Sequence, residues 1–214
     1  PGGKVEPGET ARAALVRELQ EELGVRVDHA WPWVTCQFSY PHATVRLRFY
    51  RVRTWHGEPA PIEHSALVWM TAGAAATVAP ILPANAPILR ALALPPLYAL
   101  SNATENGVTA ELARLKTGLA KGLRLFQVRD KTLPAEQRRA LARAVVALAG
   151  EWPQTMVLIN DDAELAHAVA AQGLHLSSQR LWEIERRPEF EQVAASCHGA
   201  ADLARAAELG LDFV

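Results

Sequence analysis

Three glutamates near the start of the chain have a spacing that suits metal-assisted chemistry on phosphates. Glu18, Glu21 and Glu22 stand at positions i, i+3 and i+4, so on a helix they share one face. Three like charges on one face repel one another, which an ordinary surface helix avoids. A hard divalent cation bridging them to substrate phosphates removes that penalty, and Mg²⁺ suits this task because it binds few protein carboxylates and keeps several waters.

The residues around these acids predict the helix that must position them. Thr10 can cap the start of the helix, and Gly24 can end it in the left-handed conformation. An apolar stripe at helical spacing would seat it on a core: Ala13, Ala14, Leu15, Leu19 and Leu23. Gly2, Gly3 and Gly8 would let the preceding loop fold back so that its backbone approaches the metal.

The loop and the helix together follow one long pattern. Read from Gly3, the chain runs G-x5-E-x7-R-E-L-x-E-E-L-G-V, and each fixed position is filled: Gly3, Glu9, Arg17, Glu18, Leu19, Glu21, Glu22, Leu23, Gly24 and Val25. This resembles the Nudix box of nucleoside diphosphate-linked hydrolases. The alternative, a capped and glutamate-rich solvated helix, explains the acids but not the match of the loop.

The region after the box has the composition of strands. Residues 31–40 and 43–55 predict a hairpin with a turn at residues 40–42, and residues 66–70 predict a third, short strand. In the second run the alternation of apolar and basic residues slips at Phe49-Tyr50, which indicates a bulge, a twist or a strand end. Residues 82–94 predict a short helix after a proline-marked start.

This order of elements resembles MutT-type Nudix enzymes, which hydrolyse oxidised purine nucleoside triphosphates, from residue 1 to about residue 92. The resemblance includes W-x-G-E-P at residues 55–59 and P-A-N-x-P at residues 83–87. It implies that Asn85, an amide that donates and accepts hydrogen bonds, reads the purine edge. Tyr40 and Leu82 are candidates for the walls around the base, although such residues more often fill a core.

The same resemblance implies the catalytic roles. Glu18, Glu21, Glu22, Glu63 and the Gly2 carbonyl would hold Mg²⁺, with Mn²⁺ as a second candidate. Glu18 or Glu63 would help deprotonate the attacking water. Arg17 would orient the acids, by pairing with Glu9. Taken alone, Glu63 is more often a solvated loop acid and Asn85 more often a turn residue, and only their register with the box favours the functional roles.

After Leu94-Pro95-Pro96 the chain alternates short apolar strands with helices, which predicts a parallel sheet covered by helices. We expect strands at residues 97–100, 123–129, 155–160, 174–177 and 193–197, with a sixth at 212–214. The predicted fold class is α/β, a partial Nudix α/β/α sandwich followed by an incomplete TIM-type (β/α) barrel. The predicted domains are residues 1–92 and 97–214, joined by a linker at 93–96.

Motifs in this second half resemble thiamine phosphate synthases and their TenI relatives. They are Q-x-R-x-K at residues 127–131, Asn160-Asp161, G-x-H-L at 173–176, and S-x-H at Ser196–His198. The resemblance implies that Arg129 and Lys131 bind pyrophosphate, Asn160 the pyrimidine and Asp161 a Mg²⁺ ion. Further candidates at these strand ends are Gln127 and Ser196. The alternative is that each is an ordinary polar cap on a strand end.

One position departs from that family pattern. Where the synthases place a metal-binding aspartate after G-x-H-L, this chain has Arg180, which cannot ligate a cation. We therefore keep three hypotheses. The leading one is hydrolysis of 8-oxo-dGTP and related nucleotides, a nucleotide-sanitation function that protects DNA. The others are a bifunctional protein that also makes thiamine phosphate, and a non-catalytic barrel half that senses a thiamine-related phosphate.

Composition bounds the remaining possibilities. A net charge of −1 over 214 residues indicates no broad basic face for duplex nucleic acid, and no apolar run is long enough to span a membrane. Cys36 and Cys197 are too few and too distant in sequence for a disulfide framework, so we expect reduced thiols in a cytoplasmic protein. The chain starts inside its strongest motif and stops in an expected strand, so we expect an internal segment of a longer protein.

Overall fold

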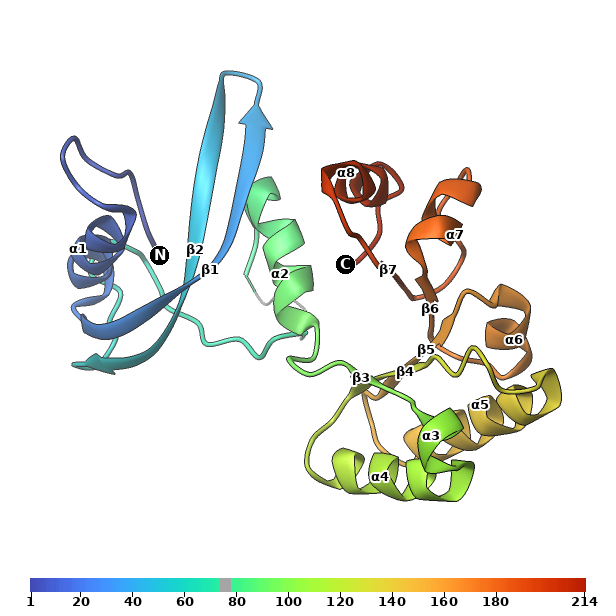
Figure 1. Cartoon of the computed structure of the whole chain (residues 1–214). Coiled ribbons are helices and arrows are strands. Elements are labelled where there is room, and N and C mark those ends of the chain that lie inside the picture. Colours follow the sequence, from blue (N-terminus) through green and yellow to red (C-terminus); the bar gives the residue numbers. More distant parts are fainter. Residues whose placement is uncertain (74–77) are drawn as a thin grey trace. The chain divides into compact units, whose positions relative to one another are not determined.

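The computed structural model of the chain describes residues 1–73 and 78–214. These residues form two units, Pro1–Ile88 and Leu89–Val214. Figure 1 shows the first unit from blue to green and the second from green to red. The predicted linker at residues 93–96 begins at the last residue of helix α2 (Ala86–Ala93), whereas the structural division falls within that helix.

Helix α1 (Ala11–Leu23) begins and ends at the residues that the sequence predicts. The Thr10 side chain accepts a hydrogen bond from the Ala13 N–H at 3.1 Å. Gly24 adopts φ 70°, and its N–H donates to the carbonyl of Gln20 at 3.0 Å. Because a left-handed residue carries little steric cost only when it is glycine, the helix stops here and the chain turns into the first strand.

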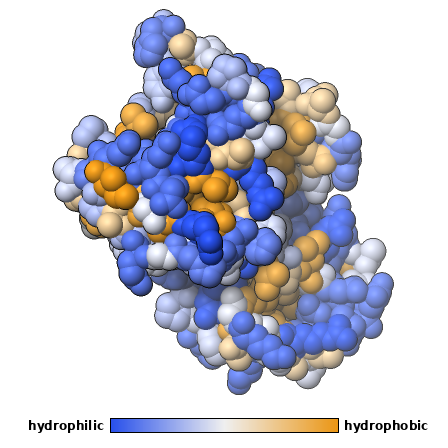
Figure 2. Space-filling model, turned by 90° about the vertical axis from the view of Figure 1, so that its left-hand side faces the viewer, coloured by the Kyte–Doolittle hydropathy of each residue, from blue (hydrophilic) through white to orange (hydrophobic). Residues whose placement is uncertain are grey.

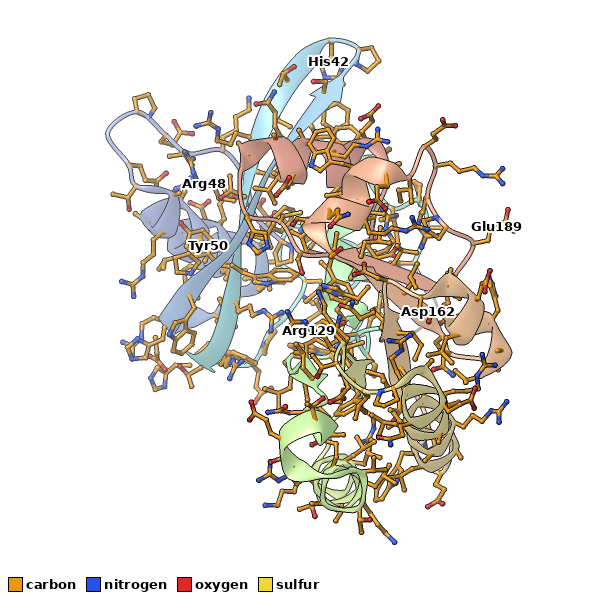
Figure 3. The ribbon with its side chains drawn as sticks, turned by 45° about the vertical axis from the view of Figure 1, so that its right-hand side comes forward. His42, Arg48, Tyr50, Arg129, Asp162 and Glu189 are labelled. Atoms are coloured by element: carbon orange, nitrogen blue, oxygen red, sulfur yellow. The ribbon has the colours of Figure 1, made fainter. Side chains whose placement is uncertain are left out.

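Strands β1 (Arg26–Tyr40) and β2 (Ala43–His56) form the predicted antiparallel hairpin, with His42 at its tip (Figures 1 and 3). Pro32 pairs with Tyr50, and Thr35 pairs with Arg48. Two residues of β1 therefore oppose one residue of β2 at the predicted phase slip. The irregularity is a bulge whose additional residue lies on β1, and β2 continues through it.

The core of the first unit is small. Leu19, Leu23 and Val25 are buried, and the partly buried side chains packed against them come from α1, the hairpin and the following loop: Leu15, Val27, Val52, Trp55 and Leu67. Figure 2 shows apolar residues scattered among hydrophilic ones on one face of the molecule. Large apolar side chains of this unit that stay exposed include Trp31, Ile62 and Trp69.

The strand predicted at residues 66–70 is wrong, because this segment pairs with no other strand in the described part of the chain. Two of its side chains nevertheless pack on this unit, since Leu67 contacts the core and the ring of Trp69 stacks on that of Trp55 with 6.2 Å between centroids. The predicted helix at residues 82–94 is confirmed as a 3-10 turn, η1 (Pro83–Asn85), followed by α2.

The second unit is a five-stranded parallel sheet in the order β3-β4-β5-β6-β7. Its strands are β3 (Ala99–Leu100), β4 (Leu125–Val128), β5 (Met156–Asn160), β6 (Gly173–Leu176) and β7 (Gln192–Ala195). The helices between them are α3 (Ala103–Asn106), α4 (Val108–Ala120), α5 (Ala135–Gly150), α6 (Ala163–Ala168), α7 (Ser178–Glu183) and α8 (Ala200–Glu208). This sheet with its helices confirms the predicted α/β class.

The expected sixth strand at residues 212–214 is not formed as a strand. Phe213 makes a single parallel bridge with Ala194, in which the Asp212 N–H donates to Val193 O at 2.9 Å and the Ala195 N–H donates to Phe213 O at 3.2 Å. The direction of pairing is the predicted one, but one bridge is too short to count as a strand.

The central strands of this sheet are buried on both faces, as a parallel sheet covered by helices requires. The outer face packs under the helices through Phe126, Val157, Leu174 and many others. The opposite face carries a smaller cluster built on Leu125, Leu158 and Ala194, with Tyr98, Met156 and Phe213 packed against it. Across residues 1–73 and 78–214, no helix is both long and apolar enough to cross a membrane.

Gly173 tests how tightly the strands of the second unit are packed. A Cβ atom there would lie 2.5 Å from the Gln192 carbonyl oxygen and 2.8 Å from the Leu158 side chain, so neighbouring backbone would have to move. We expect Gly173→Ala to lower the free energy of unfolding by about 1–3 kcal/mol, measured by urea denaturation. Gly150→Ala is the matched control, because it meets open space at a helix end; an equal loss in both variants would contradict the packing argument.

Candidate active sites

Arg17 is the centre of the site in the first unit. Its guanidinium donates to Glu9 Oε1 at 3.1 Å, to Glu18 Oε1 at 2.8 Å, to Glu21 Oε2 at 3.0 Å and to the Lys4 carbonyl at 3.0 Å. The hydrogen bond from Arg17 holds the pKa of Glu9 below its usual value, and the same bond raises the pKa of Arg17. One cation therefore ties the loop to two acids of the helix.

Among Glu9, Glu18, Glu21 and Glu22, the most enclosed acid is Glu22, with 8% of its surface exposed. Its Oε2 accepts a hydrogen bond from the Gly2 N–H at 2.7 Å, and its Oε1 lies 3.3 Å from His64 Nε2. Its backbone carbonyl accepts from Ile62 N–H at 2.9 Å. The loop before the helix and the loop after the hairpin thus both converge on Glu22.

The loop also passes close to Glu18. A Cβ atom on Gly3 would overlap the Glu18 carboxylate, so only glycine allows this approach. The glycine of the box therefore has a steric role beside the acids. The loop folds back on the helix as the glycines predict, and it is the Gly2 N–H that contacts Glu22, whereas the role of the Gly2 carbonyl as a metal ligand stays a prediction.

The donor set of this site fits a hard divalent cation. Within the described ranges, no three His, Cys, Asp or Glu side chains gather as a ready-made metal cluster. Glu18 and Glu21 instead turn towards Arg17. Mg²⁺ does not need such a cluster, because one or two carboxylates together with substrate phosphates commonly hold it. The enclosed Glu22 and the adjacent Glu18 are carboxylates of the required kind.

The other candidates of the first unit lie in different places. Glu63 is exposed in the loop after the hairpin, next to His64. Asn85 is half-buried in η1, and Leu82 directly before it is exposed. Tyr40 lies at the end of β1, 4.7 Å from Phe38 and close to the hairpin tip.

His64 is a contact that the sequence reasoning missed. His64 stands in no metal-ligand spacing along the chain, yet its ring is within ion-pairing distance of Glu22. The only signal was its position beside Glu63 in a loop that returns to the helix. Spacing along the chain cannot reveal such a pair, since the two residues are 42 positions apart.

In the second unit the predicted residues lie at the carboxyl ends of neighbouring strands. Gln127 donates to Asn160 Oδ1 at 3.0 Å, and Asn160 donates to Asp161 Oδ2 at 2.9 Å. Asp161 Oδ1 accepts from the Ser177 N–H at 2.6 Å. Asp161 has φ 56°, a left-handed conformation that aspartate tolerates better than most residues. The chain therefore turns sharply at Asp161, and one row of hydrogen bonds connects the carboxyl ends of β4, β5 and β6.

Arg129 and Lys131 follow β4 and line two neighbouring depressions of about 450 and 500 Å³. Figure 3 labels Arg129 after β4 and Asp162 after the next strand, β5. Asp130, between the two cations, is buried and accepts hydrogen bonds from Ser101 Oγ and from the Thr104 N–H. Because Asp130 is fixed in this way, the residues on either side of it point outward and are exposed.

A second hydrogen-bonded row crosses the same end of the sheet. Tyr98 OH lies 3.1 Å from His175 Nδ1, and His175 Nε2 lies 3.0 Å from Ser196 Oγ. Burial lowers the pKa of His175 to about 4, and the positive charges of Arg129 and Lys131 act in the same direction. Sequence reasoning identified Ser196 but not Tyr98, whose residue type and position predicted only a strand.

Comparison with known proteins also separates the chain into two parts. The model of the Nudix domain family matches residues 1–92, and the thiamine monophosphate synthase model matches residues 97–214, more than half of the chain. The 8-oxo-dGTP diphosphatase of Escherichia coli is 40% identical over 93 residues, which cover 43% of this chain and 70% of that enzyme. The chain belongs to both families.

Two further relatives mark the range of each half. The CTP pyrophosphohydrolase of Escherichia coli is 40% identical over 90 residues, covering 42% of this chain and 66% of that protein. The thiamine-phosphate synthase of Herpetosiphon aurantiacus is 36% identical over 119 residues, covering 55% of this chain and 57% of that protein. The chain thus spans about half to two thirds of the length of these two relatives.

The Arg17 network of the Nudix domain leads to a structural prediction. We expect Arg17→Gln to release the loop, so that peptides covering residues 2–9 exchange their amide hydrogens about tenfold faster by mass spectrometry. Arg12→Gln on the same helix is the control, since Arg12 is exposed and makes no side-chain hydrogen bond among the described residues. Unchanged exchange in Arg17→Gln would show that other contacts hold the loop.

The buried His175 leads to a pH prediction. Its folded-state pKa of about 4 lies below the ordinary value of 6.5, so the unfolded chain binds a proton that the folded chain does not. Stability should be unaffected above about pH 6.5 and fall by on the order of 3 kcal/mol as the pH drops to 4. We expect His175→Gln to reduce this slope in denaturant melts, whereas His198→Gln, with an exposed ring, should keep it. Identical slopes in all three proteins would contradict the assignment.

Proposed function

We propose that the Nudix domain hydrolyses oxidised purine nucleoside triphosphates such as 8-oxo-dGTP to the monophosphate and pyrophosphate. The observation that supports this most directly is the complete box, with loop and helix joined through Arg17, in a chain that covers 70% of an 8-oxo-dGTP diphosphatase at 40% identity. Such a reaction would remove damaged nucleotides before they reach DNA.

The acids of the box are the proposed metal ligands. Glu18, Glu21, Glu22 and the Gly2 carbonyl would hold Mg²⁺, or Mn²⁺ in its place, with Glu63 as a further ligand. When bound, the ion neutralises charge on the phosphate oxygens and lowers the pKa of a coordinated water. Loading would require Glu18 and Glu21 to exchange part of their contact with Arg17 for the ion and its phosphates.

The remaining residues of the site have roles that follow from their positions. Arg17 would keep Glu18 in place through its second attachment to Glu9. Glu18 or Glu63 would accept a proton from the attacking water. His64 would hold the side chain of Glu22, which its ring approaches to 3.3 Å. These groups position the acids and move the proton, while the ion would stabilise the charge on the phosphate oxygens.

The base is proposed to lie near Asn85, whose amide can donate to and accept from a purine edge. Leu82, whose carbonyl accepts a hydrogen bond from the Asn85 N–H at 2.9 Å, is exposed and would cover one face of the ring. Tyr40 remains the second wall candidate, and its ring pairs with Phe38 and His42 at the end of the hairpin. A substrate panel of 8-oxo-dGTP, dGTP and CTP tests this assignment, since preference for CTP would point to a pyrimidine pocket instead.

Glu22→Gln tests the metal site directly. The amide keeps the shape of the side chain but removes its charge, so we expect turnover of 8-oxo-dGTP to fall by about 10³-fold or more with an unchanged circular dichroism spectrum. Glu6→Gln is the control, because the exposed Glu6 side chain makes no hydrogen bond within residues 1–73 and 78–214. Near-full activity of Glu22→Gln at saturating Mg²⁺ would overturn the proposal.

The thiamine monophosphate synthase domain supports a second candidate function. Its family match and the cations Arg129 and Lys131 at the strand ends favour binding of a phosphorylated thiamine precursor. Formation of thiamine phosphate from the pyrimidine pyrophosphate and the thiazole phosphate would show a bifunctional enzyme, and binding without product would show a sensing module. Both cysteines are free thiols, which fits our placement of the protein in the reducing cytoplasm.

A further inference from the structure

The depression of about 450 Å³ in the second unit contains Asp161, the residue to which the synthase family assigns a magnesium ion. The depression is lined by residues that follow β4, β5 and β6, and its charged members carry both signs. Its cations are Arg129, Lys131, Arg138 and Arg180, and its acids are Asp130, Asp161, Asp162 and Glu164. The formal charges of the two sets balance, so the hydrogen-bond partners of each acid decide whether that acid is available to bind a cation.

Three of the four acids already have hydrogen-bond partners for both of their oxygens. Asp130 is bound by Ser101 and Thr104, as described above. Asp161 accepts from Ser177 N–H and from Asn160, one bond on each oxygen. Asp162 caps α6 through the Leu165 N–H and meets Arg138 at 3.4 Å. These acids are used to hold the strand ends together.

The cations of this depression have fewer bonding partners than its acids. Among the described residues, neither Arg129 nor Lys131 forms an ion pair with a carboxylate, and both side chains are exposed in the depression. Arg180 shares one guanidinium nitrogen with Glu183 at 3.0 Å, which leaves its other donors available. The groups free to meet a ligand are therefore mainly donors with positive charge.

The backbone of Arg180 is connected to the proposed metal-binding Asp161 through Ser177, and the Arg180 side chain lines the same depression as that acid. The Ser177 N–H donates to Asp161, and the Ser177 hydroxyl accepts from the Arg180 N–H at 3.2 Å. One serine thus connects the acid to the residue that replaces the second carboxylate of the family. A divalent cation at Asp161 would lack that carboxylate and would meet a guanidinium in its place, so these residues do not fit the metal.

We propose that this depression binds a diphosphate group without a divalent cation, with Arg180 supplying the positive charge that a metal ion would otherwise provide. Arg129 and Lys131 bind the phosphate oxygens from one side, and Arg180 binds them from the Asp161 side. Guanidinium groups suit this role because their planar donors match phosphate oxygens in pairs. A volume of about 450 Å³ suits a small phosphorylated molecule. The inference concerns the second unit alone and does not depend on the proposed hydrolysis.

The test is calorimetric titration of the full chain with inorganic pyrophosphate, in EDTA and in Mg²⁺. We expect saturable binding in EDTA that Mg²⁺ changes by less than about twofold. Arg180→Asp should weaken binding in EDTA by about tenfold or more. It should also recover affinity when Mg²⁺ is added, because it restores the missing carboxylate. Arg180→Gln should weaken binding without such recovery.

Controls separate this site from the Nudix domain and from general charge effects. Arg143→Asp, the same charge change at an exposed position of α5, should bind as the unmodified chain does. Glu22→Gln should leave pyrophosphate binding in EDTA intact, whereas Arg129→Gln should weaken it. Binding by the unmodified chain that requires Mg²⁺, or an absence of binding in EDTA at millimolar pyrophosphate, would overturn the proposal.

Discussion

Carboxylates that lie close together need hydrogen-bond donors or cations as partners, and the partners of these carboxylates organise both halves of this chain. Glu22 accepts from the Gly2 N–H, Glu18 and Glu21 meet Arg17, and Asp161 accepts from the Ser177 N–H. An enclosed carboxylate without a partner would cost several kcal/mol, so each of these bonds also fixes the loop that provides it. The loops that border the sites are held in place by the acids themselves.

The partners of the carboxylates differ between the two halves. In the Nudix domain Glu18 and Glu21 share Arg17, and in our proposal a cation arriving with phosphates replaces part of that contact. In the synthase domain Asp130, Asp161 and Asp162 are each bound by neighbouring groups, and the donors left for a ligand belong to Arg129, Lys131 and Arg180. Resemblance to a metal-dependent family therefore carries different weight in each half, because the partners of the acids differ.

His64 and Tyr98 show where reasoning along the chain ends. Neither residue stands in a motif, and each acquires a partner only because a loop or a strand brings it to a distant residue: Glu22 in one case and His175 in the other. The strand expected at residues 66–70 shows the converse. Its apolar composition is typical of a strand, but a strand also needs a neighbour to pair with, and one segment alone does not specify that neighbour.

The sequence by itself determined the box, the ends of α1, the hairpin, and the alternation of strands and helices, because these depend on local spacing, capping and periodicity. It also located Arg180 where the synthase family has an acid. Only the tertiary structure decided that Arg17 links four groups at once, that the bulge belongs to β1, and that Ser177 joins Asp161 to Arg180. These features include contacts between separated residues, such as Arg17 with Lys4 and Ser177 with Asp161, and those contacts are set by how the loops close over the helix and the sheet.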